Sequence, residues 1–280
     1  MPQLALQITL ILRYCCYFFI FSACSGLFSE AHAKCTRKIH VAFSPTGLTA
    51  IAKDNEISGV YPDLLSSMAN KDGCLFNFSI VPRARQELMF QNGQTDLLLP
   101  AIRTSRRDAF GTFVPLLYTR AALISIQSDL PPVSSIQDLL DRKSAKVVVV
   151  RGYDYGDVYV NLMQELMKQE RLIYEANPGS VARMLKAGAA EYTLMAPYIL
   201  IGEVARDARV RDLEDKLHFE ILSEIPWLDS GVYLSTKTLT EQDKQSLQVL
   251  FNSAAKSGFV WKFFQNYYQS EALNLGSRPR

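Results

Sequence analysis

One stretch of the chain, from Gly93 to Tyr118, constrains the fold more than any other. It reads GQTDLLLPAIRTSRRDAFGTFVPLLY, and its segment from Asp96 to Pro100 is too apolar to be anything but a buried strand. Three arginines, Arg103, Arg106 and Arg107, follow that strand directly. Sheets of α/β proteins collect ligand contacts at the carboxyl ends of their strands. The stretch therefore predicts either a site for a carboxylate or phosphate or, as the alternative, a solvated loop with spare charge.

The first residues of the chain predict an export signal. Arg13 precedes the apolar run from Tyr14 to Ala23, and Ala31-His32-Ala33 has the small-x-small pattern that signal peptidase cuts. We expect cleavage after Ala33, a mature chain that begins at Lys34, and a periplasmic location. The mature net charge then stays at +2, because Arg13 and Glu30 leave together, and we expect no nucleic-acid partner.

The leader has two alternative interpretations. A membrane anchor is disfavoured because Tyr14 to Phe28 is shorter than the ~20 apolar residues that a spanning helix needs. A lipoprotein signal, with the lipid on Cys24, is the second alternative, and the position three residues before that cysteine is poorly matched.

Export leaves Cys35 and Cys74 as the cysteines of the mature chain. Two cysteines in an oxidising compartment predict one disulfide. Each lies just before a predicted strand, at residues 39–43 and 76–81, so both fall at the same edge of a sheet. A metal site would need more ligands, and we expect none.

The mature chain alternates short apolar runs with amphipathic segments, which is typical of α/β construction with mainly parallel strands. The predicted strands are residues 39–43, 76–81, 96–100, 146–150, 171–175, 192–195, 217–222 and 231–234. The proline pair at Pro131 and Pro132 and the restart of the pattern after it predict a second lobe. We assign residues 34–123 and 225–280 to one lobe and residues 124–224 to the other, with a ligand cleft between them.

Motifs for catalysis are missing from this pattern. His40 and His218 sit inside predicted strands and are interpreted as structural, and the acidic pair Glu214 and Asp215 as a solvated face. The sequence has no phosphate loop, dinucleotide fingerprint, nucleophile elbow or HExxH motif. We therefore expect a binding protein that needs no cofactor.

Several short motifs, in order and spacing, resemble those of one family. They are Gly59 with Asp63-Leu64, Gly93 with Asp96-Leu97, Thr104 with Arg107 in a T-x-x-R segment, Phe113 with Pro115 and Tyr118, Ile136 with Leu139, Gly152, and Gly258 before an aromatic tail. Over essentially its whole mature length the chain resembles the bacterial extracellular solute-binding proteins of family 3, which are periplasmic receptors of polar amino-acid ABC transporters. The resemblance implies a two-lobed periplasmic-binding-protein-like fold of type II. It also implies that Arg107 clamps a ligand carboxylate with help from Thr104.

The chain departs from the family at positions that usually meet the ligand ammonium. Ala196 stands where an aspartate is usual, Ser44 where an acidic residue often helps, and Arg83 where an aromatic residue lies. Glu191 is the alternative acid if the alignment at Ala196 is shifted. Because an unpaired buried ammonium is costly, this cleft is expected to prefer an anion without a free α-amine. The remaining candidate ligand contacts are Ile102, Gly152, Tyr153 and Asp154.

The leading functional hypothesis is a monomeric solute-binding protein that captures a small carboxylate-bearing solute by hinge closure and delivers it to the permease of an ABC importer. A dehydratase- or lyase-like enzyme of small carboxylic acids on the same fold is one alternative. A free-standing sensory binding protein is the other.

Overall fold

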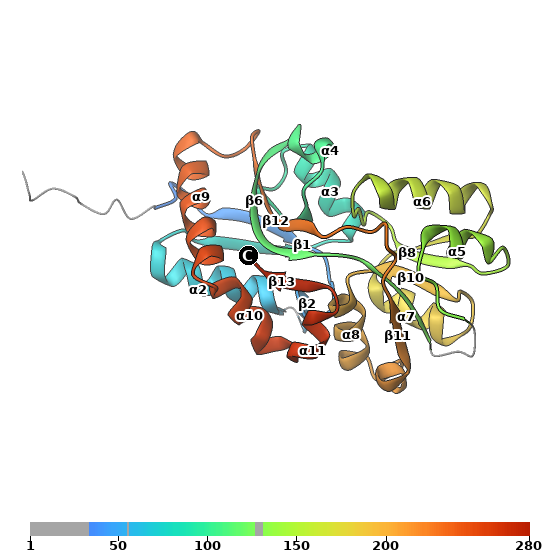
Figure 1. Cartoon of the computed structure of the whole chain (residues 1–280). Coiled ribbons are helices and arrows are strands. Elements are labelled where there is room, and N and C mark those ends of the chain that lie inside the picture. The colour runs from blue at the N-terminus through green and yellow to red at the C-terminus, as the bar shows by residue number, and fades with distance from the viewer. Residues whose placement is uncertain (1–33, 55, 127–130) are drawn as a thin grey trace, which may run out of the picture. The chain divides into compact units, whose positions relative to one another are not determined.

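The structure is a computed structural model that describes residues 34–54, 56–126 and 131–280. The predicted signal peptide, residues 1–33, and the alternative lipid site at Cys24 lie outside the described residues. Within the described ranges the chain builds two β-sheets flanked by helices, as the alternating pattern predicts (Figure 1). No helix in these ranges is long and apolar enough to cross a membrane.

The first sheet has six strands in the order β13-β6-β12-β5-β1-β4. These strands are β1 Ile39–Phe43, β4 Phe76–Ile80, β5 Leu97–Ile102, β6 Gly111–Thr119, β12 Leu228–Ser235 and β13 Ser277–Pro279. Its helices are α2 Val60–Asp72, α3 Arg83–Gln91, α4 Ser105–Asp108, α9 Glu241–Lys256, α10 Phe259–Tyr267 and α11 Ser270–Asn274, and a small hairpin joins β2 Ile51–Lys53 to β3 Glu56–Ser58. We call this part, residues 34–120 and 228–280, the first lobe.

The second sheet has five strands in the order β11-β7-β10-β8-β9. These are β7 Ala122–Ile126, β8 Val147–Val150, β9 Leu172–Glu175, β10 Tyr192–Met195 and β11 Leu217–Glu220. The helices around it are α5 Ile136–Asp141, α6 Asp157–Lys168, α7 Pro178–Lys186 and α8 Pro197–Arg206, with a 3₁₀ helix, η1, at Arg211–Lys216. We call residues 121–220 the second lobe.

Local sequence explains where the elements begin and how deeply they lie. All four valines of β8 are buried, and five of the six residues of β5 are buried, as expected for central strands covered on both faces. Thr240 caps the start of helix α9, because its side chain accepts a hydrogen bond from the backbone N–H of Asp243. Asn177 caps α7 in the same way, with Pro178 in its first turn.

The strand directions differ from the prediction of mainly parallel sheets. Strands β4, β1 and β5 are parallel, as are β10, β8 and β9, but β12 and β7 pair antiparallel with their neighbours. The reason is the route of the chain: β6 leads to the second lobe and β12 leads back, so these two long neighbours run in opposite directions.

The first crossing between the sheets lies at Arg120 and Ala121, between β6 and β7. The boundary predicted at Ile124 therefore falls inside β7, whereas the one at Ile225 falls in the segment 221–227 that leads back to β12. Strand β13 pairs with β6 at Thr119, next to the first crossing.

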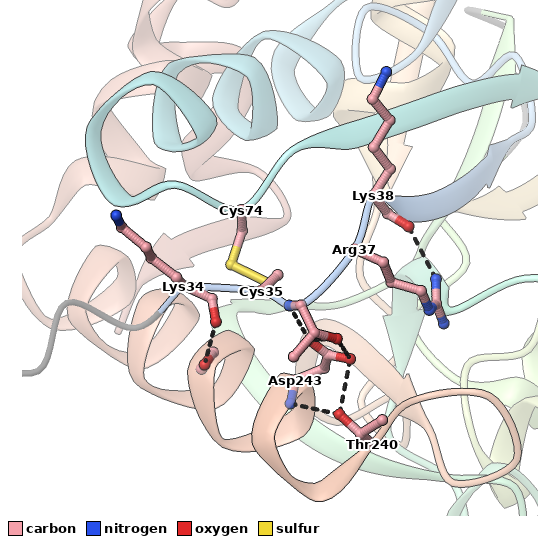
Figure 2. Close-up of a disulfide and its surroundings, with 9 residues drawn as sticks. Lys34, Cys35, Arg37, Lys38, Cys74, Thr240 and Asp243 are labelled. Carbon is pink, nitrogen blue, oxygen red and sulfur yellow. Dashed lines mark hydrogen bonds between the residues drawn. A yellow bond between two sulfur atoms is a disulfide. The ribbon is translucent and has the colours of Figure 1, made fainter.

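The predicted disulfide is present between Cys35 and Cys74, whose Cα atoms are 4.8 Å apart (Figure 2). Strands β1 and β4, which follow the two cysteines, pair in parallel with Ile39 opposite Phe76. The backbone N–H of Thr36 donates to Asp243 of α9 over 2.7 Å. The start of the described chain is thus fixed to both β4 and α9.

Replacing both cysteines, Cys35→Ser with Cys74→Ser, should lower the free energy of unfolding by about 3–4 kcal/mol, because the disulfide closes a loop spanning 39 residues in the unfolded chain. Urea unfolding measures this change. A reductant should lower the melting temperature of the wild type and leave the double variant unaffected. Equal stability of the two proteins would contradict the structural role.

Candidate functional site

A small cavity of about 50 Å³ lies where both lobes meet, and we call it the first cavity. It is lined by Thr46, Arg83, Pro100, Ala101, Ile102, Thr119, Tyr153, Asp154, Tyr155, Tyr198, Ile199 and Ser230. Ile102 ends β5, and Tyr153 follows the carboxyl end of β8. The cavity therefore occupies the edge where strands of α/β sheets place their ligand contacts.

Beside this cavity three buried charged side chains form one cluster. Glu87 accepts hydrogen bonds from Arg83 at 2.5 Å and from Arg107 at 2.5 and 3.2 Å. Arg83 and Glu87 are one turn apart on α3, and all three residues are at most 6% exposed. Burial alone would raise the pKa of Glu87, but the guanidinium groups of Arg83 and Arg107 reverse this and hold that pKa below its usual value.

Arg107 is placed differently from the expectation that it clamps a ligand. Its guanidinium is 1% exposed, binds Glu87 and the carbonyl oxygen of Ile102 (2.8 Å), and is absent from the cavity lining. The hydroxyl of Thr104 accepts from the backbone N–H of Arg107 and so caps α4. Glu87 binds the same guanidinium N–H groups of Arg107 that would hold a ligand carboxylate. Direct contact of Arg107 and Thr104 with a solute stays a prediction.

Arg83 does line the cavity, and part of its guanidinium is free. Its Nη1 donates to the carbonyl oxygen of Pro100 at 2.9 Å and to Gln86, whereas the buried Nε has no hydrogen-bond partner among the described residues. From the other lobe, the buried hydroxyl of Tyr153 also lacks such a partner in the described part of the chain, with Thr46 as a polar neighbour. Buried polar groups in native proteins are nearly always satisfied, so these two atoms call for a ligand or water.

Asp154 closes one side of the cavity by an ion pair between the lobes. Its Oδ2 lies 2.9 Å from Nη2 of Arg106, and its Oδ1 accepts from the backbone N–H of Gly156. Burial would raise the pKa of Asp154, but Arg107 and Arg106 lower it, so this carboxylate stays ionised at neutral pH. The side chain of Arg106 is half exposed yet contributes to this contact.

The other predicted residues lie around the cavity or away from it. Gly152 has φ 89°, and a Cβ there would come within 3.2 Å of the Ala84 Cα, so only glycine lets the loop after β8 approach α3. Ala196 is fully buried and donates its backbone N–H to the hydroxyl of Tyr155 at 2.9 Å. Glu191, the alternative acid, directly precedes β10 and accepts a hydrogen bond from the backbone N–H of Lys146, which directly precedes β8. Ser44 lines a second, separate cavity.

Sequence reasoning missed four polar residues of the first cavity. Thr119 and Ser230 come from the crossing strands β6 and β12, whose pairing the pattern did not reveal. Tyr198 could have been found, because it follows the carboxyl end of a predicted strand. Thr46 lies in the loop after β1, two residues beyond the predicted Ser44. Burial raises the pKa of Tyr198 to about 12, so its hydroxyl remains a neutral donor.

The described residues contain no group of three or more His, Cys, Asp or Glu side chains that could hold a metal ion. Asp154 in the cavity lining and Glu87 beside Arg83 are both paired with arginines and have lowered pKa values. Such groups are poor proton donors at neutral pH. The arrangement is suited to binding a polar solute through neutral hydroxyls and guanidinium N–H groups.

No family model matches this chain, and no curated protein matches it. Solved structures are similar in fold: an ancestral arginine-binding protein bound to glutamine has a TM-score of 0.65 at 15% identity, covering 82% of this chain and 97% of that one. A histidine kinase sensor domain with similarity to periplasmic binding proteins has a TM-score of 0.65 at 17% identity, covering 83% and 96%.

An amino acid ABC transporter substrate-binding protein from Streptococcus pneumoniae, bound to L-arginine, has a TM-score of 0.65 at 18% identity and covers 82% of this chain and 94% of that one. At these identities the likeness shows the fold: the chain has the two-sheet α/β architecture of periplasmic binding proteins.

The substitution Glu87→Gln should lower the free energy of unfolding by about 3–5 kcal/mol, because it leaves two buried guanidinium groups without a counter-charge. Glu165→Gln is the matched control: this exposed glutamate pairs with Lys168, and its loss should change stability by less than about 0.5 kcal/mol. Urea unfolding compares the two. Equal small effects would show that the cluster carries no net stability.

The same variant should change the pH dependence of stability. The lowered pKa of Glu87 stabilises the folded protein above the unfolded pKa of about 4.3, and this contribution is lost as pH falls through the folded value. The wild type should therefore lose stability more steeply than Glu87→Gln as the pH is lowered from about 5.

Proposed function

We propose that this protein is a solute-binding protein that captures a small carboxylate-bearing solute in the first cavity and acts in the periplasm as a monomer. The observation that carries the proposal is the pair of unsatisfied buried atoms, Arg83 Nε from the first lobe and the Tyr153 hydroxyl from the second, on the wall of one cavity. A solute that bonds to both would join the lobes.

Capture requires the lobes to separate. A cavity of about 50 Å³ is far below the roughly 300 Å³ at which ordinary small-molecule pockets begin. Two connections, at Arg120–Ala121 and along residues 221–227, link the lobes, and hinges of this kind absorb the motion in a few backbone angles. We therefore propose that the first cavity belongs to a closed form and that entry of the solute needs an open one.

The charges around the cavity favour an anion. Arg83, Arg106 and Arg107 face two carboxylates, Glu87 and Asp154, which leaves one net positive charge. Ala196 offers no carboxylate for an ammonium group. We therefore propose a solute with a carboxylate and no free α-amine, held by Arg83 and Tyr153, while Arg107 acts through Glu87 to position Arg83.

Delivery to the permease of an ABC importer is the proposed next step, supported by the likeness in fold to amino acid ABC transporter binding proteins. A sensory role is the second candidate, because the sensor domain of a histidine kinase has the same fold. Genes for a permease and an ATPase beside this one would favour transport, and a kinase gene would favour sensing. An enzymatic role would need a cleft carboxylate that is free to exchange a proton. Glu87 and Asp154 are held ionised by arginines. Burial raises the pKa of Glu203, but its two oxygens are occupied by the backbone N–H of Gly47 and by Arg206.

A thermal-shift screen of the purified protein across α-amino acids, dicarboxylates and aromatic acids tests this function. Acids without an α-amine should raise the melting temperature. Tyr153→Phe should stabilise the ligand-free protein by up to about 1 kcal/mol, because an unpaired buried hydroxyl is removed. The same variant should lower the affinity for the solute about tenfold.

Arg83→Lys should lower the affinity for the solute by a similar factor, since lysine keeps the charge but lacks the Nε–H and the planar guanidinium. Arg85→Lys on the same helix is the control: Arg85 is exposed, and solute affinity should not change. Tight binding of ordinary α-amino acids that both cavity variants retain would reject the assigned site and ligand class.

A further inference from the structure

A second cavity between the lobes is much larger than the first, at about 430 Å³, and shares no lining residue with it. Its walls are Ser44, Pro45, Ile80, Val81 and Pro82 from the first lobe and Ala176, Asn177, Gly179, Arg183, Glu203, Arg206, Asp207 and Arg209 from the second. The size lies within the range of about 300–1,000 Å³ that holds small molecules. Residues directly after the parallel strands β1, β4 and β9 contribute to it.

Three arginines give this cavity a cationic wall. Arg209 forms a two-pronged ion pair with Asp207, with Nε and Nη2 at 2.9 and 2.7 Å, so its charge is largely compensated. Arg206 uses its Nε for Glu203 at 3.1 Å, and its two Nη groups have no hydrogen-bond partner in the described ranges. Arg183 donates to the Ser180 hydroxyl and reaches Asp207 only at 3.5 Å.

The two acids of the wall are already occupied by the protein. Glu203 is buried and accepts the backbone N–H of Gly47, in the first lobe, at 3.0 Å, in addition to Arg206. Asp207 is held by Arg209. Against these two carboxylates stand three guanidinium groups, which leaves one net positive charge at the cavity.

The guanidinium of Arg183 lies beside the start of α7, together with a carboxylate oxygen of Glu203. A Cβ added to Gly179 would lie 3.5 Å from Arg183 Nη1 and 3.4 Å from Glu203 Oε2, so these atoms surround the glycine. The dipole of α7 adds a partial positive charge at the same end of the helix.

We propose that the second cavity is a separate binding site for a compact oxyanion, either a carboxylate or a phosphate group, held by Arg183 and Arg206. The ligand would lie between the first-lobe strand ends and the second-lobe helices α7 and α8. Because both lobes form the walls, an oxyanion here stabilises the closed form, and it does so without entering the first cavity. The site is thus an effector site for solute capture.

Isothermal titration of the purified protein with inorganic phosphate and with succinate, at constant ionic strength, tests the site. Succinamide is the uncharged control for succinate. Saturable binding of phosphate alone would assign a phosphate ligand, and binding of succinate alone a carboxylate ligand. Arg206→Gln should weaken the bound probe about tenfold to a hundredfold, since a hydrogen bond between charged groups is lost.

Arg183→Gln is the second variant, because Arg183 has the weaker internal contacts and its loss leaves no buried acid unpaired. Arg211→Gln is the control, an exposed arginine of η1 outside the cavity lining, and should leave affinity unchanged. Tyr153→Phe should also leave probe affinity unchanged, which separates this site from the first cavity.

The proposal is overturned if neither probe binds saturably, or if both arginine variants bind like the wild type while their melting curves show a folded protein. Loss of probe binding in Tyr153→Phe would also overturn it, because the probe would then occupy the first cavity. If no solute raises the melting temperature but an oxyanion still binds in a way that depends on Arg183, the proposed function is rejected and the second site stands.

Discussion

The buried contact of Glu87 with Arg83 and Arg107 is the interaction on which the cleft wall depends. It connects α3 with α4, and through the carbonyl oxygens of Pro100 and Ile102 it also fixes both helices to the end of β5. Burying one unpaired charge would cost too much desolvation free energy. One carboxylate shared by two guanidinium groups instead leaves one net positive charge in a buried region. That residual charge is the basis for proposing an anionic solute in the first cavity.

The lobes meet through contacts of different strength. Gly47 and Gly202 allow the loop after β1 to touch α8, where a Cβ on either would come within 2.7 Å of backbone atoms of the other segment. Polar contacts from Glu203 and Asp154 add to this packing. At the crossings, the guanidinium groups of Arg120 and Arg278 both lie over the ring of Trp227, 4.6 and 4.5 Å from its centre. Strand β13, which carries Arg278, therefore ties both connections together.

Features that depend on the local residue pattern could be predicted from the sequence. Contacts between residues far apart in the chain could not be predicted as well. Strands β1 and β10 begin and end where the pattern predicts, since buried apolar runs leave little choice. The disulfide followed from two cysteines placed before neighbouring strands. The partner of Arg107 was not predictable, because Glu87 lies 20 residues earlier on α3, and only the packed fold decides which carboxylate reaches the guanidinium.

The same limit explains why the donors that line the cavity differ from those that the sequence favoured, within a correctly predicted fold. An arginine near the carboxyl end of a strand can face the cleft or the core. Its direction depends on which acceptor, internal or external, binds its guanidinium N–H groups. Here an internal glutamate occupies Arg107, and an internal aspartate pairs with Arg106 across the cleft. The donors left for a solute are Arg83 Nε and the Tyr153 hydroxyl. Selectivity in such a cleft depends on geometry more than on net charge. One net positive charge shared among five ionised groups attracts any small anion, whereas two fixed donors from opposite lobes match the acceptor positions of only a few solutes.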